Sequence, residues 1–102
     1  MGMRMFVHVC LLNFVAPLDP TQVRVVFDGF SRLAKLIPEI RSYTFGPDLE
    51  MRSGNAQYAL VAEFDNEEHF VTYRDNPEHI AFAKTVMAPL IKSVQSCQFI
   101  KN

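Results

Sequence analysis

The sequence predicts an α+β fold: one four-stranded antiparallel sheet with helices on one face, the ferredoxin-like arrangement. The hydrophobic patterns follow the order strand, helix, strand, strand, helix pair, strand, which is the split βαβ order. The length of 102 residues is enough for one hydrophobic core and too short for two, so we expect a single domain over residues 1–102. A third observation, a first strand that is apolar on both faces, indicates that both faces of the sheet are covered.

The first strand is predicted over residues 5–14, which are rich in β-branched and aromatic side chains and end before a loop with two prolines. Right-handed crossover connections place this strand in the middle of the sheet. Alternation assigns the side chains to two faces, one with Phe6, His8, Cys10, Leu12 and Phe14 and the other with Met5, Val7, Val9, Leu11 and Asn13.

The first helix is predicted from its capping signal and its apolar period. Asp19 is a suitable N-cap and Pro20 fits the first helical position. Apolar residues then recur at three- and four-residue spacing until Pro38 stops the helix. Gly29 lies inside it at a cost of roughly 1 kcal/mol relative to Ala, which indicates close packing or simple tolerance.

A hairpin follows the first helix. Residues 40–45 and 57–64 alternate as strands, and the segment between them contains a Gly46-Pro47-Asp48 turn and a loop over residues 49–56. Glu63, in the second of these strands, can point into a barrel between two copies of the chain, where Arg41 is a candidate partner.

Two helical segments and a final strand complete the pattern. Asp65 or Asn66 caps a helix that runs to about Asp75, and His69 is expected on its solvated face. The Asn76-Pro77 pair then opens a second helical segment that Pro89 bends or ends. Residues 93–100 form the closing strand.

The open sheet face requires a partner. Helices cover only one face of such a sheet, yet the first strand is apolar on both faces and the third strand nearly so. Because the chain has no further element to cover the second face, we expect a homodimer joined through the open sheet face.

The charge and composition exclude several classes of partner. The net charge is −1, and the ten Lys and Arg residues are scattered without a cluster, so neither nucleic acid nor a membrane is expected as a partner. The apolar run 6–14 is too short to span a bilayer, which favours a cytoplasmic protein. Cys10 and Cys97 each lie in a predicted strand and are expected as buried reduced thiols ahead of a disulfide, with a metal site last.

Several segments carry a resemblance to a known family when they are taken in order. They are the strand 7–14, the helix end with Leu36-Ile37-Pro38-Glu39-Ile40, the Phe45-Gly46-Pro47 turn, the strand end Ala62-Glu63-Phe64 before an acidic helix start, and Tyr73-Arg74-Asp75-Asn76-Pro77-Glu78-His79. In this combination, which spans almost the whole chain, the sequence resembles the stress-responsive dimeric α/β barrel (A/B barrel) domain family.

The resemblance implies a fold and a candidate chemistry. In the family, two ferredoxin-like sheets close a barrel with the helices outside, and plant polyketide cyclases of this type catalyse an aldol cyclisation without a cofactor, using a histidine and a tyrosine. The matching positions are His79 and Tyr73. The sequence departs from the family pattern at Asn13, where lysine is frequent, and at Tyr58 and Asn76, where histidines occur. The resemblance implies no cofactor, and the sequence contains no CxxC motif or Cys/His pair at zinc spacing, so no metal is expected.

The residues themselves support these candidate catalytic positions and leave alternatives open. His79 lies in the first turn of a helix, where the positive dipole end favours a neutral imidazole, a suitable general base; otherwise it forms only local hydrogen bonds. His8 is a satisfied core histidine, a pocket-lining group or, least favoured, a metal ligand with the two cysteines. Tyr73 orients a substrate oxygen or rests at the helix end. The predicted ligand-binding residues are His8, Tyr58 and Phe27.

Three function classes follow. The first is a dimer that binds a small, mostly apolar molecule in a pocket between sheet and helices, with an enzymatic version in which His79 is the general base of a cofactor-independent polyketide cyclase-like or isomerase reaction. The second is a cofactor-free monooxygenase-like protein on the same barrel, which the absence of Trp disfavours. The third is a purely structural dimer.

Overall fold

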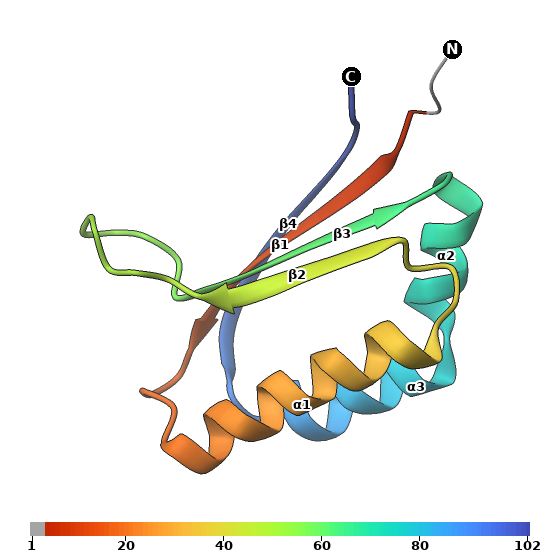
Figure 1. Cartoon of the computed structure of the whole chain (residues 1–102). Helices are drawn as coiled ribbons and strands as arrows, with labels where there is room; N and C mark the ends of the chain where they lie inside the picture. The colour runs from red at the N-terminus through yellow and green to blue at the C-terminus, as the bar shows by residue number, and fades with distance from the viewer. Residues whose placement is uncertain (1–3) are drawn as a thin grey trace.

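The computed structural model describes residues 4–102, which form one sheet and a layer of helices beneath it (Figure 1). Four strands and three α-helices follow in the predicted order, and the last helix continues into a π-helical turn. The elements are β1 (Phe6–Phe14), α1 (Pro20–Leu36), β2 (Ser42–Pro47), β3 (Tyr58–Phe64), α2 (Glu67–Asp75), α3 (Pro77–Phe82), η1 (Ala83–Met87) and β4 (Ile91–Ile100).

The sheet has the strand order β2-β3-β1-β4, with every neighbouring pair antiparallel. β1 is therefore a central strand, and all helices lie against the same face of the sheet (Figure 1). The predicted α+β, ferredoxin-like fold is confirmed, and both termini of the described chain lie at one end of the sheet.

The local signals act as predicted at the start of α1. The Asp19 carboxylate accepts a hydrogen bond from the Gln22 backbone N–H at 2.8 Å, and the Gln22 side chain accepts one from the Asp19 N–H at 3.0 Å. The helix ends at Leu36, with Ile37 as its C-cap before Pro38. Its inward stripe consists of the buried residues Val26, Phe30 and Leu33.

Several boundaries differ from the prediction. β2 begins at Ser42 because a turn with a hydrogen bond from the Ile40 N–H to the Ile37 carbonyl, at 3.2 Å, precedes it. Gly46 and Pro47 belong to β2 rather than to the predicted turn, because they pair with Ala59 and Tyr58 of β3. The last helical segment is not α-helical up to Pro89: at η1 the Ala88 N–H bonds to the Ala83 carbonyl at 2.8 Å, five residues back. β4 then starts at Ile91, earlier than the predicted residue 93.

The hydrophobic core lies between the sheet and the helices and consists of two adjoining clusters. One surrounds Phe64 and the other Phe30. Gly29 allows α1 to pack closely against Phe82 of α3. A Cβ at this position would overlap the Phe82 ring, whose Cδ1 would lie 2.8 Å away. Close packing, rather than simple tolerance, therefore accounts for a glycine inside α1.

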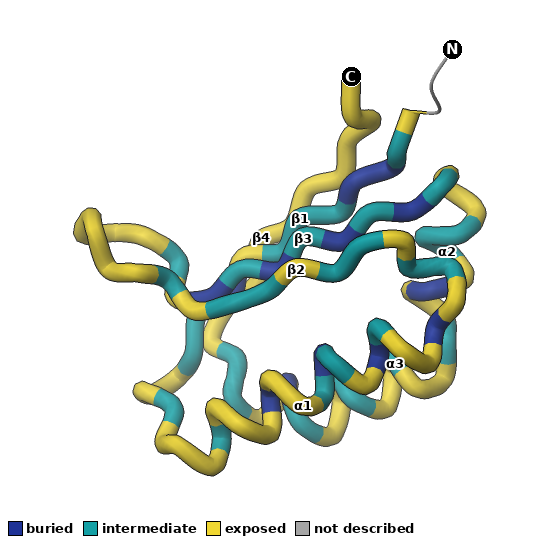
Figure 2. Tube along the Cα trace, viewed as in Figure 1, coloured by how far each residue is buried: buried dark blue, intermediate teal, exposed yellow. Residues whose placement is uncertain are grey.

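The opposite face of the sheet carries no helix. The register places Val7 and Phe99 in one row across it and Val9 and Cys97 in the next, while Leu11 and Phe99 are 38% and 49% exposed. β4 is exposed along nearly its whole length (Figure 2). The open face is thus apolar, as predicted.

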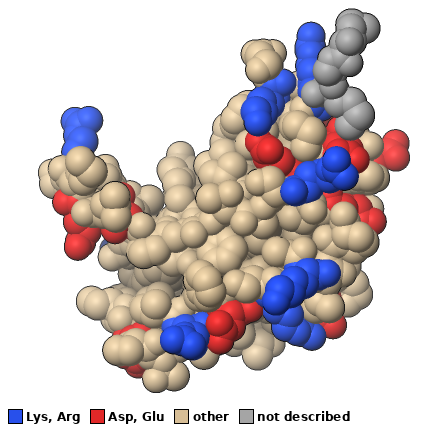
Figure 3. Space-filling model, viewed as in Figure 1, with Lys and Arg blue, Asp and Glu red and all other residues tan. Residues whose placement is uncertain are grey.

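The Lys and Arg side chains on the face of the molecule seen in Figure 3 are spread over separate regions and form no single cluster there.

Glu63 shares a row of the open face with Val7, but its partner is Lys101, at 3.1 Å. The predicted pairing with Arg41 is wrong because Arg41 instead lies 3.2 Å from Asp65 at the start of α2.

Three further predictions concern single residues or the membrane. Both cysteines are free, as predicted, but neither is fully buried: Cys10 is half-buried, and Cys97 is exposed because it lies on the uncovered face of the edge strand β4. Cys10 shares a row with Ser96 and Cys97 pairs with Val9, so the two thiols lie on opposite faces of the sheet. His69 is half-buried rather than solvated, and its Nδ1 is enclosed without a hydrogen-bond partner. No helix within residues 4–102 is long and apolar enough to cross a membrane.

Candidate functional site

A cavity of about 420 Å³ opens between the β1–β4 half of the sheet and the helical segment from α2 to η1. We call it the histidine–tyrosine cavity, because its polar side chains are His8, Tyr73 and His79. Most of the remaining wall is apolar, with Leu12, Phe30, Leu60, Phe82, Met87, Ile91 and Val94. The three polar groups that the sequence singled out therefore meet in one place.

Tyr73 reaches the cavity from the last turn of α2. This helix forms here because the Asn66 side chain caps it, accepting a hydrogen bond from the His69 backbone N–H at 2.8 Å. The Tyr73 side chain is only 2% exposed, and its hydroxyl lies 2.8 Å from the hydroxyl of Tyr43. Burial raises the pKa of Tyr73 to about 12, while the hydrogen bond with Tyr43 acts in the opposite direction.

His79 lies in the first turn of α3. Asn76 caps this helix, since its side chain accepts a hydrogen bond from the Glu78 N–H at 2.8 Å. The His79 Nδ1 is 3.0 Å from the backbone carbonyl oxygen of Arg74. A carbonyl oxygen only accepts, so Nδ1 carries the proton, and in the neutral ring Nε2 keeps its lone pair. The imidazole is thereby prepared to accept a proton or a hydrogen bond at Nε2.

The Tyr73 ring lies close to both imidazoles. Its centroid is 4.3 Å from that of His79 and 6.3 Å from that of His8. The phenol is therefore flanked by two histidines, one from the sheet and one from α3.

His8 reaches the cavity from the helix-facing side of β1. Its Nδ1 lies 2.9 Å from the side-chain nitrogen of Gln98 on β4, which donates, so the proton of the neutral ring is on Nε2. Burial, followed by the charge of His79, lowers the pKa of His8 below 6.5. Neutral His8 thus presents a donor where His79 presents an acceptor.

The cavity can therefore hold an apolar molecule that carries an oxygen. The apolar wall contributes burial, the His8 Nε2–H is a hydrogen-bond donor, and the His79 Nε2 is an acceptor and a candidate base. The Tyr73 hydroxyl donates or accepts according to the direction of its hydrogen bond with Tyr43. Within residues 4–102, no cluster of three or more His, Cys, Asp or Glu side chains is arranged to bind a metal ion.

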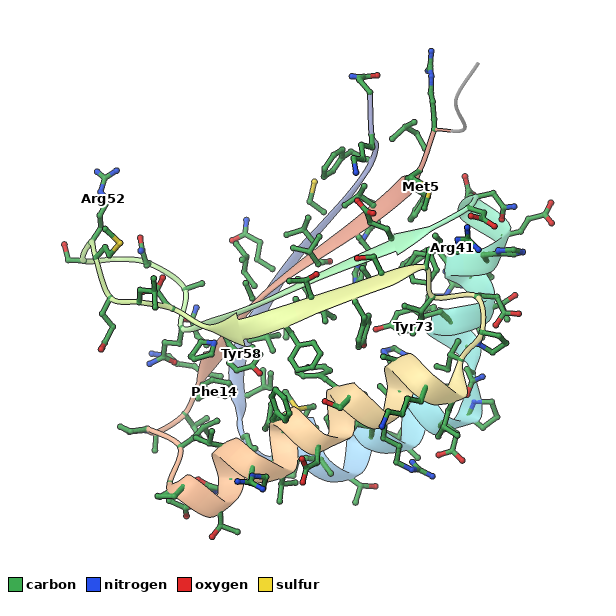
Figure 4. The ribbon with its side chains drawn as sticks, viewed as in Figure 1. Met5, Phe14, Arg41, Arg52, Tyr58 and Tyr73 are labelled. Carbon is green, nitrogen blue, oxygen red and sulfur yellow. The ribbon has the colours of Figure 1, made fainter. Side chains whose placement is uncertain are left out.

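The other two predicted ligand-binding residues lie elsewhere. Tyr58 and Phe27 line a separate hollow of about 780 Å³ at the opposite end of the sheet, beneath the loop between β2 and β3. Figure 4 shows Tyr58 and Phe14 together at that end, away from Tyr73. The Phe30 ring lies between the two regions, with its centroid 6.0 Å from that of Tyr58 and 5.2 Å from that of Phe82.

Two side chains that contact the site were not predicted as part of it, Tyr43 and Gln98. The register aligns Tyr43, Ala62, His8 and Gln98 in one row across the four strands, on the helix-facing side. Alternation within each strand indicates the face on which such a residue lies. It does not indicate which residues of different strands share a row, so the sequence pattern could not reveal this group.

Comparisons with known proteins agree with this architecture. The family model of the stress responsive A/B barrel domain matches residues 6–100. A stress-response A/B barrel domain-containing protein of Arabidopsis thaliana is 25% identical over 87 residues, which cover 83% of this chain and 80% of that protein.

Solved structures resemble the chain over nearly its whole length. A dimeric ferredoxin-like protein of unknown function from Thermobifida fusca is 34% identical, with a TM-score of 0.84 over 94% of this chain and 90% of that one. The hydroxynitrile lyase of Passiflora edulis is 19% identical, with a TM-score of 0.86 over 99% of this chain and 96% of that one. At that identity the likeness concerns the fold.

Proposed function

The chain belongs to the stress-responsive A/B barrel domain family, and we propose that it binds a small, mostly apolar, oxygen-bearing molecule in the histidine–tyrosine cavity. One observation carries this proposal: side chains from β1, α2 and α3 bring His8, Tyr73 and His79 to one otherwise apolar cavity. A few convergent polar groups in an apolar wall are typical of small-molecule sites.

A variant that fills the cavity tests this proposal. Val94 lines the cavity and is 54% exposed, so Val94→Trp places an indole across the cavity without disturbing the core. We expect small aromatic ligands such as para-nitrophenol to shift the imidazole NMR signals of His8 and His79 in the wild type, and to lose this effect in Val94→Trp. Val25→Trp, at an exposed α1 position outside the cavity, is the matched control. Equal ligand binding in both variants would contradict the proposal.

We further propose proton transfer, with His79 as the base, as the reaction this site supports. The hydrogen bond from the His79 Nδ1–H to the Arg74 carbonyl favours this version, because it directs the lone pair of the neutral ring to Nε2. The same fold supports a hydroxynitrile lyase in Passiflora edulis, so it is compatible with catalysis. Polyketide-like or enolisable carbonyl compounds are the substrate class we propose.

Hydrogen–deuterium exchange tests this catalytic version. We expect the wild type to accelerate exchange of the protons beside the carbonyl of aryl methyl ketones in D2O, as measured by NMR, and His79→Gln to lose the acceleration while it still folds. Gln keeps a polar side chain but has no basic nitrogen. Equal exchange rates in both proteins would rule out His79 as the base. The proposed ligand binding would not be affected by that result, because it is measured separately.

We also propose that the protein is a homodimer joined through its open sheet face. No helix covers this face within the described chain, Leu11 and Phe99 on it are exposed, and the relative from Thermobifida fusca is dimeric. Leu11→Glu would place a charge in this interface. We expect it to yield monomers in analytical ultracentrifugation, whereas Val25→Glu, at a similarly exposed helix position, stays dimeric. A wild type that sediments as a monomer would refute the proposal.

A further inference from the structure

Tyr43 contacts the candidate site through one atom. Its hydroxyl lies 2.8 Å from that of Tyr73, although Tyr43 comes from β2 and does not line the histidine–tyrosine cavity. Tyr73 does line it. The pair therefore connects a residue behind the cavity wall with a residue in the wall.

The available hydrogen-bond partners decide which hydroxyl donates. Among the residues the structure describes, neither hydroxyl has another partner. If Tyr73 donated, the Tyr43 proton would have no acceptor inside the core, which is unfavourable for a buried donor. If Tyr43 donates, its proton is satisfied and the Tyr73 proton is free to turn toward the cavity. The second arrangement leaves no donor unpaired once the cavity is occupied.

Both phenols keep their protons at neutral pH. Burial is the largest cause that raises the pKa of each. Each hydroxyl therefore has a proton that needs an acceptor, and the available partners decide the direction of the bond.

Tyr43 is also held rigidly. It lies in the row of the sheet that continues through Ala62 to His8, and its ring packs against Phe30, with centroids 6.0 Å apart. The Tyr43 and Tyr73 rings meet edge to face at 5.9 Å. The Tyr43 hydroxyl is thus positioned by a paired strand residue whose ring packs against two neighbouring rings.

We infer that Tyr43 is a positioning residue, whose hydroxyl donates to the Tyr73 hydroxyl and turns the Tyr73 proton toward an oxygen of the molecule bound in the histidine–tyrosine cavity. The inference rests on the proposed ligand binding. It adds a requirement for the ligand, namely an oxygen that accepts a hydrogen bond from Tyr73, and this requirement is strongest for an oxygen that carries negative charge.

Two probes of similar size test the inference, para-nitrophenolate with a charged oxygen and toluene with none. Dissociation constants are measured by NMR for the wild type and for Tyr43→Phe, which removes only the hydroxyl oxygen. We expect Tyr43→Phe to weaken para-nitrophenolate binding about tenfold, the range of one hydrogen bond, and to leave toluene binding unchanged. Thr44→Val, which removes a hydroxyl from the other face of β2, should change neither.

A double variant separates positioning from packing. If Tyr43 acts through Tyr73, then Tyr43→Phe causes no further loss of para-nitrophenolate affinity when Tyr73→Phe is already present. A full second loss in the double variant, or wild-type affinity in Tyr43→Phe, would overturn the inference while the proposed binding stands. Failure of the wild type to bind either probe would instead refute the proposed binding, and the inference would fall with it.

Discussion

The contact between Gly29 and Phe82 allows a quantitative test of how α1 and α3 pack around the site. A Cβ at Gly29 would overlap three carbons of the Phe82 ring, so Gly29→Ala forces the ring or the helix to move. Phe82 lies in the wall of the histidine–tyrosine cavity and against Phe30, with ring centroids 5.2 Å apart. The substitution therefore perturbs both stability and the shape of the cavity.

Two opposing contributions set the magnitude. Replacing a helical Gly by Ala favours the helix by about 1 kcal/mol. Overpacking a well-packed core costs about 1–3 kcal/mol, and the extent of overlap with Phe82 favours the upper part of this range. We expect a net loss of about 1–2 kcal/mol in the free energy of unfolding, which lowers the melting temperature by about 4–8 °C for each kcal/mol.

Urea unfolding and toluene binding measure the two consequences. Gly29→Ala should unfold at lower urea concentration than the wild type and bind toluene more weakly, because the displaced ring enters the cavity. Combining it with Phe82→Leu should recover part of the lost stability, with a coupling of about 0.5–3 kcal/mol. A stabilised Gly29→Ala would refute the reasoning, since helix propensity alone would then account for the position.

Two further predictions concern the histidines. The pKa of His8 is lowered below 6.5 in the folded protein, so the unfolded state binds the proton first as the pH falls. The free energy of unfolding should therefore decrease as the pH drops below 6.5 toward the folded-state pKa. His8→Gln should flatten this part of the pH profile measured by urea unfolding, and an unchanged slope would contradict the assignment. Asn76→Ala removes the cap of α3, so it should lower the free energy of unfolding by about 1 kcal/mol and broaden the NMR signals of His79. The control variant Asn55→Ala, in the loop between β2 and β3, should not affect those signals.

Most of the fold was predictable because its signals are local. The caps at Asp19, Asn66 and Asn76 each bond to a backbone N–H two or three residues ahead, so they act within one helical turn. The boundary errors have two causes. At the start of β2, the Arg41 N–H bonds to the distant Glu63 carbonyl at 2.8 Å, a contact that the local pattern does not contain. At η1, the Ala88 N–H bonds to the carbonyl five residues back, and side-chain periodicity does not distinguish such a turn from an α-helical one.

The candidate site was predictable only in part. Tyr73 and His79 are six positions apart on consecutive short helices, so their closeness follows from local geometry. Alternation within β1 assigns His8 to one face of the strand, but its place opposite His79 depends on how the helices pack on the sheet. Tyr58 and Phe27 line the other hollow, because the Phe30 ring occupies the space between the two ends of the core.

The amino-acid sequence alone determined the order and type of the elements and the two apolar faces of β1, because caps, prolines and side-chain periods act over a few residues. Only the tertiary structure decided the register that places Tyr43 in one row with His8, and the packing that joins Tyr73 to both histidines. Strand register is set by the fit of the whole core, and no short segment contains that information.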